Sequence, residues 1–191
     1  MDPDGREILT FLDPQKNKII VQAAEKYPDD AAIHIFAHGS PKGMSVFADG
    51  KTISIRNVKQ LDKLLSKYSE TWKNKGEKDN ITIVLHSGRT GEGENSFAQK
   101  VSEGLEGVTV IAPDQRGYFS SKGEFGAYKA KYVDDNNEYE RNNDGQIKSK
   151  ERSNELGNWR VFRDGKETES YKGDWKPKEN PSWWDKFLNK N

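Results

Sequence analysis

The chain has 191 residues, of which 32% are charged and 32% hydrophobic, and its formal net charge is zero. This length suffices for one domain with a sizeable core, and a neutral chain lacks the basic excess typical of proteins that bind nucleic acid. No apolar run approaches the roughly 18 residues of a membrane span, and the absence of cysteine excludes disulfides and thiolate metal sites.

Residues 1–6, Met-Asp-Pro-Asp-Gly-Arg, contain two turn-forming dipeptides and are typical of a leader segment. The stretch 7–30 holds a helical candidate that ends at Pro28. Its apolar residues have helical spacing: Ile19, Ile20, Ala23, Ala24 and Tyr27.

Residues 31–37 predict the first buried strand. Two alternating runs then flank Asp49-Gly50, a dipeptide that favours a tight β-hairpin. Asn57 is a suitable N-cap for a helix that we expect to run through Lys73. The apolar stripe of this helix is Val58, Leu61, Leu64, Leu65 and Tyr68.

A second strand is predicted at 81–86 and a third at 108–113, both rich in β-branched residues. Between them, a helix is expected to begin at Asn95 or Ser96. Apolar strands that alternate with amphipathic helices predict an α/β domain, residues 7–133, with a mostly parallel sheet covered by helices.

Residues 134–158 are rich in Asp, Asn, Glu and Lys and predict a polar loop or a disordered segment. Residues 159–191 contain all but one of the five tryptophans. We expect this Trp-rich extension to be irregular and to pack on the domain; the alternative is a surface that binds a partner.

His38 is the first candidate functional residue, because it directly follows a buried strand and precedes Gly39, whose N–H is sterically open to a ligand. Ser87 and Gly88 follow the next strand of the predicted sheet. Ser87 could act as a nucleophile with His38 as its base, or the loop could bind phosphate, although the motifs typical of either are missing. A zinc site would need a third ligand besides His34 and His38, and only His86 remains, so we expect no metal.

Several blocks, in this order, resemble the caspase-like (clan CD) cysteine peptidases, and more closely a branch found as toxin domains of bacterial polymorphic toxins. The first two are His38-Gly39-Ser40-Pro41-Lys42-Gly43 and Ser87-Gly88-Arg89-Thr90-Gly91. Ser96-Phe97-Ala98-Gln99 and the strand 108–113 follow, and 158–162 resembles the end of the same toxins. The leader resembles the motif that closes the core of Rhs proteins.

The resemblance implies a caspase-like three-layer α/β/α fold in which His38 is the general acid or base. Gly39 and Gly88 would supply the backbone N–H groups of the oxyanion site. Ser87 and Arg89 would contact substrate, and so would Asp114 and Gln115, which follow the third strand. No cofactor is implied.

The family's nucleophilic cysteine falls on Gly88, so this form should not cleave peptides by that route. Three explanations remain open: a substitution that allows a toxic protein to be produced, a natural pseudopeptidase, or different chemistry by Ser87 or another group.

The resemblance further implies a secreted effector of interbacterial competition, delivered by a secretion system into the cytosol of a target cell. Its partners would be a protein substrate and a cognate immunity protein, with no nucleic acid and no membrane span. The alternative function is a non-catalytic interaction domain that uses the Trp-rich extension.

Overall fold

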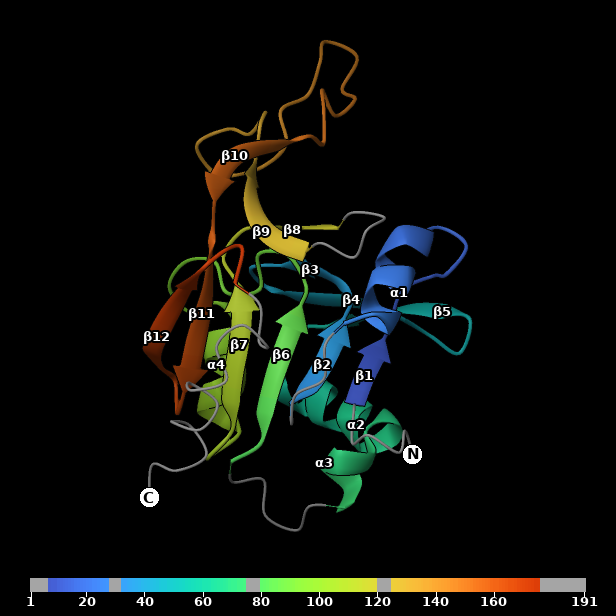
Figure 1. Ribbon diagram of the computed structural model, residues 1–191, viewed down its shortest axis with the longest axis vertical. Helices are drawn as coiled ribbons and strands as arrows, with labels where there is room; N and C mark the ends of the chain where they lie inside the picture. The colour runs from blue at the N-terminus through green and yellow to red at the C-terminus, as the bar shows by residue number, and fades with distance from the viewer. Residues whose placement is uncertain (1–6, 28–31, 75–79, 120–124, 176–191) are drawn as a thin grey trace.

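A computed structural model describes residues 7–27, 32–74, 80–119 and 125–175. Its centre is a six-stranded sheet with the order β1-β2-β6-β7-β11-β12 (Figure 1). The first four strands are parallel, and the last two join antiparallel. The strands are β1 (Glu7–Thr10), β2 (Ile33–Phe36), β6 (Thr82–His86), β7 (Thr109–Pro113), β11 (Asn158–Arg163) and β12 (Lys166–Lys172).

The central strands are buried on both faces, and their side chains alternate between two apolar cores. Ile35 and Leu85 point into one core, which also contains residues of α2 (Val58–Tyr68) and α4 (Phe97–Gly104). Phe36 and Val84 point into the other core, against α1 (Lys18–Glu25). Helices therefore cover both faces of the sheet (Figure 1), which confirms the predicted α/β fold with a mostly parallel sheet.

The predicted helix starts are confirmed by their caps. The side chain of Asn57 accepts a hydrogen bond from the backbone N–H of Gln60, and Ser96 caps α4 in the same way. The helix expected to run to Lys73 is broken at Ser69, whose backbone is extended and whose hydroxyl accepts from the N–H of Trp72. That bond starts a separate short helix, α3 (Glu70–Asn74).

The helix predicted within residues 7–30 is confirmed as α1, Lys18–Glu25, but a strand at the start of this stretch was missed. Residues 7–10 form β1, which pairs in parallel with β2. The four residues of β1 are half-buried throughout, so they lack the alternation that marks a strand in a sequence. Their conformation depends on the neighbouring strand.

The predicted hairpin is confirmed as β4 (Gly43–Ala48) and β5 (Lys51–Ile55). Asp49 and Gly50 both have positive φ angles, 51° and 72°, as a two-residue turn of this kind requires. A third strand, β3 (His38–Ser40), pairs with β4. His38 therefore begins a short strand, whereas the sequence predicted a loop.

A second small sheet contains β8 (Arg116–Phe119), β9 (Phe125–Ala130) and β10 (Arg152–Leu156). Between β9 and β10, residues 131–151 form a polar arm that projects from the top of the molecule in Figure 1. Isolated bridges join Val133 to Tyr139 and Arg141 to Ile147. The segment predicted as a polar loop or a disordered segment, residues 134–158, includes most of this arm and the strand β10.

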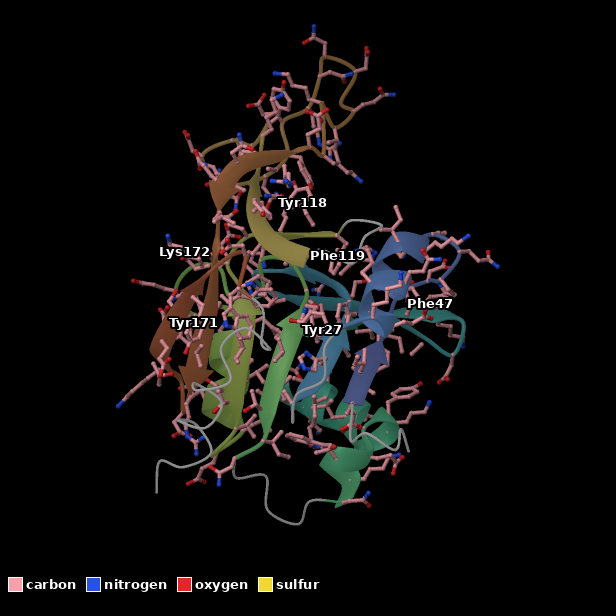
Figure 2. All side chains as sticks on the ribbon, in the orientation of Figure 1. Tyr27, Phe47, Tyr118, Phe119, Tyr171 and Lys172 are labelled. Atoms are coloured by element: carbon pink, nitrogen blue, oxygen red, sulfur yellow. The ribbon has the colours of Figure 1, made fainter. Side chains whose placement is uncertain are left out.

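The central sheet continues into the segment predicted as a C-terminal extension, because β11 and β12 lie beyond residue 133. Trp159 is fully buried, and Trp175 packs on it with ring centroids 5.8 Å apart. Trp175 also stacks on Tyr171, which Figure 2 labels beside β12. Residues 158–172 are thus two strands of the central sheet, where an irregular extension was expected from residue 159. Residues 176–191, like the leader 1–6, lie outside the described residues.

Replacing Leu61 with alanine should lower the free energy of unfolding by about 2–5 kcal/mol, because this fully buried side chain lies in the core beneath α2. Lys63→Ala on the exposed face of the same helix should change it by less than about 0.5 kcal/mol. Urea denaturation checks both values, and equal effects of the two substitutions would contradict the packing described.

Candidate active site

The site lies where β2 and β6 end side by side. Phe36 is in register with His86, so the residues that follow both strands reach the same edge of the sheet. A Cβ atom added to Gly39 would lie 2.5 Å from the carbonyl oxygen of Gly88 and 2.7 Å from the carbonyl carbon of Ser87. The His38-Gly39 and Ser87-Gly88 blocks are therefore in direct backbone contact, and only glycine at position 39 allows it.

An open pocket of about 480 Å³ lies at this contact. His38, Gly39, Gly88 and Arg89 line it, so four of the predicted site residues share one pocket. Its further walls come from α1, β8 and the polar arm. A second pocket, of about 380 Å³, lies between His38 and the hairpin strands β4 and β5.

Gly88 has space for a small side chain. A Cβ atom there would lie 3.2 Å from the Cα of Arg116 and from the backbone nitrogen of Gly117. This contact is tight, but a shift of a few tenths of an ångström relieves it, and the φ angle of Gly88 is not positive. A side chain at position 88 therefore requires a small shift of the backbone at Arg116 and Gly117, whereas one at position 39 would overlap the backbone of Ser87 and Gly88 outright.

His38 is suited to accept a proton at neutral pH. Partial burial lowers the pKa of its imidazole below the usual 6.5, and the positive charge of Lys150 lowers it further. The neutral ring is the form required of a general base.

Three of the predicted substrate-contacting residues do not line this pocket. Ser87 is fully buried, and its hydroxyl points to the sulfur of Met44 at 3.4 Å. The carboxylate of Asp114 accepts hydrogen bonds from the backbone and side-chain nitrogens of Asn158, which joins the end of β7 to β11. Gln115 accepts from the side chain of Asn137. That these three residues contact a substrate remains a prediction. The Ser87 hydroxyl is buried, so it could touch a substrate only if the side chain became exposed.

Arg116 and residues of the polar arm were missed by the sequence analysis. Arg116 is 9% exposed; its guanidinium donates to the side-chain oxygen of Asn137 at 2.8 Å and lies over the ring of Tyr139. Arg89 forms ion pairs with Glu92 at 2.5 Å and with Glu138 at 2.8 Å. The contacts with the arm join residues more than 20 positions apart, so neither periodicity nor motif spacing could have revealed them.

His34 and His86 form a buried pair beneath the pocket, with Nδ1 of His34 2.9 Å from Nε2 of His86. The ring of His86 stacks on Phe36 at 4.1 Å between centroids. Burial holds the pKa of His86 well below 6.5, and the neighbouring His34 lowers it further. Among the described residues, no group of three or more His, Cys, Asp or Glu side chains is arranged to hold a metal ion.

Comparison with known protein families matches residues 8–127 to a domain of unknown function, DUF8616. The chain belongs to this family. The matched region includes β2, β6, β7 and β8 and therefore His38, Gly88 and Arg116, but it ends before the polar arm. No curated protein and no solved structure matches the chain. Within the described part of the chain, no helix is long and apolar enough to cross a membrane.

Gly39→Ala should lower the free energy of unfolding by about 1–3 kcal/mol, because its methyl group would overlap the backbone of Ser87 and Gly88. Gly88→Ala should lower the free energy of unfolding by less, because its methyl carbon would lie 3.2 Å from its nearest neighbours. Chemical denaturation of the two variants checks this order. If Gly39→Ala proved the milder substitution, the backbone contact described here would be wrong.

Stability should fall as the pH is lowered from 7.5 to 5.5. The unfolded chain protonates His86 with a pKa near 6.5, whereas the folded chain keeps the ring neutral, so protons favour the unfolded state. His86 alone should lower the free energy of unfolding by about 1.4 kcal/mol over this interval.

Urea denaturation at several pH values measures this loss. Carboxylates titrate below the interval and contribute little. His38 acts in the same direction, but its pKa is lowered less than that of His86. His38→Gln is therefore the control and should retain most of the pH dependence. A free energy of unfolding that stayed constant over the interval would show that folding does not lower the pKa of His86.

Proposed function

We propose that this chain is the toxin domain of a bacterial Rhs-type effector whose parental activity is that of a caspase-like cysteine endopeptidase. In this form the nucleophile is absent, because Gly88 stands where the peptidases that the sequence resembles have cysteine. The protein substrate lies in the cytosol of a target cell, and the producing cell is protected by a cognate immunity protein.

The backbone contact between His38-Gly39 and Ser87-Gly88 is the observation that carries this proposal. Two blocks 49 positions apart meet at the ends of adjacent parallel strands and line one pocket. A histidine and a nucleophile on such neighbouring loops can reach the same substrate carbonyl, as catalysis by the pair requires.

With a thiol at position 88, the parental reaction follows from these positions. His38 takes the thiol proton, and the sulfur attacks the scissile carbonyl carbon, whose oxygen becomes negative and accepts hydrogen bonds from backbone N–H groups near Gly39 and Gly88. The C–N bond then breaks while His38 returns the proton to the leaving amine. Water attacks the thioester, loses a proton to His38 and releases the acid and the thiol.

The glycine at position 88 removes only the attacking atom from this scheme. The lowered pKa of His38 keeps its ring neutral near pH 7, and the pocket is present. The proposed inactive form should therefore still bind the polypeptide that the parental enzyme cleaves.

Gly88→Cys should restore toxicity when the protein is expressed in the cytosol of a bacterial host, whereas the chain with Gly88 should be harmless. Growth after induction is the measurement, with expression levels matched by immunoblotting. Cleavage of host proteins or of the chain itself should accompany the loss of growth.

Two control variants separate peptidase chemistry from other effects. Gly88→Ala adds the same Cβ atom without sulfur, and the double variant His38→Ala, Gly88→Cys keeps the thiol without its base. Both should be harmless. Proteolysis that persists without His38, or the absence of any cleavage product with Gly88→Cys, would count against the proposed function.

A further inference from the structure

The pocket beside His38 contains positive charge that no carboxylate of the described residues neutralises. Lys150 lines the pocket, is exposed, and forms no ion pair with a described residue. Arg116 also lines it. Among the described residues, its guanidinium forms hydrogen bonds to Asn137 and lies over the ring of Tyr139, and neither group is charged. Arg89 differs, because Glu92 and Glu138 compensate its charge.

Arg116 as a whole residue is only 9% exposed. A charged group in such surroundings gains more from a negatively charged partner than one in water does, because the attraction is screened less. The influence of Lys150 on His38 shows that the ammonium group acts on the same space. Ile20 and Phe119 line the pocket too and offer apolar contact to the stem of a side chain.

We propose that the pocket binds the carboxylate of an acidic side chain of a polypeptide, with Lys150 and Arg116 as its cationic partners. The proposal rests on the proposed function only in taking the ligand to be a polypeptide. Nucleic acid is disfavoured, because the chain as a whole is neutral and lacks the basic excess typical of proteins that bind it.

The polar arm makes this specificity particular to the chain. Glu138, Tyr139 and Lys150 lie outside the region 8–127 that matches the family, whereas Arg116 lies within it. The hydrogen bonds from Arg116 to Asn137 and the ion pair from Arg89 to Glu138 hold the arm against the pocket. The arm thereby positions Lys150 beside His38, and family members with a different arm should select different side chains.

The test uses the chain with Gly88, which can bind without cleaving. The probes are N-acetyl-aspartate N-methylamide and its asparagine counterpart, which differ only in the charged group. Each is titrated into isotope-labelled protein and followed by NMR. The aspartate probe should shift the backbone signals of Gly39, Gly88 and Gly117, with a Kd about tenfold lower than that of the asparagine probe.

Lys150→Glu should abolish the preference for the aspartate probe, and Lys172→Glu is the matched control. Lys172 is exposed on β12 and does not line the pocket, and the substitution changes the net charge equally. Lys172→Glu should leave both affinities unchanged. Equal affinities for the two probes, or a preference that survives Lys150→Glu, would overturn the proposal. A short single-stranded oligonucleotide that displaced the aspartate probe and bound more tightly would also overturn it.

Cleavage by the Gly88→Cys variant distinguishes this proposal from the proposed function. Peptide mixtures are compared that contain either Asp and Glu or Asn and Gln at otherwise random positions. If the probes bind as expected and nothing is cleaved, the peptidase assignment fails while the acidic site stands. If the variant cleaves both mixtures equally and the protein binds both probes equally, the peptidase assignment is supported and the acidic site is contradicted.

Discussion

The site depends on one contact, the approach of Gly39 to the backbone of Ser87 and Gly88. It exists because β2 and β6 are adjacent, parallel and in register, so that both chains leave the sheet at the same edge. The burial of β2 and β6 on both faces stabilises that register, since a shift of one residue would exchange the side chains of the two cores. The position of His38 is thus a consequence of core packing.

The pocket is assembled from two kinds of structure. Its floor, at the strand ends, rests on the apolar cores, whereas the polar arm is held by hydrogen bonds and ion pairs to Arg89 and Arg116. None of the residues 131–151 belongs to either core. Polar contacts give an arm a defined position without the volume constraints of a core, so its sequence can change while the strands beneath it are retained.

The sequence predicted those parts of the fold that depend on local patterns. The parallel strands, the Asp49-Gly50 turn and the caps at Asn57 and Ser96 follow from periodicity and from short-range hydrogen bonding. The strand β1 and the partners of Arg116 could not be predicted, because the first needs a neighbouring strand and the second joins distant segments. His38 and Gly88 were found because both immediately follow strands. Asp114 was predicted to contact substrate on the same ground, but its carboxylate accepts hydrogen bonds from Asn158 and joins β7 to β11.

The two glycines of the site differ in what the fold requires of them. Gly39 leaves no space for a Cβ atom, so its identity is explained by the backbone contact alone. Gly88 has neither a positive φ angle nor a contact below 3.2 Å at the position of a Cβ atom. Glycine also costs conformational entropy on folding relative to alanine. Folding therefore requires glycine less strictly at position 88 than at position 39. The location of Gly88 beside His38 supports the proposal that it stands in place of a chemical group.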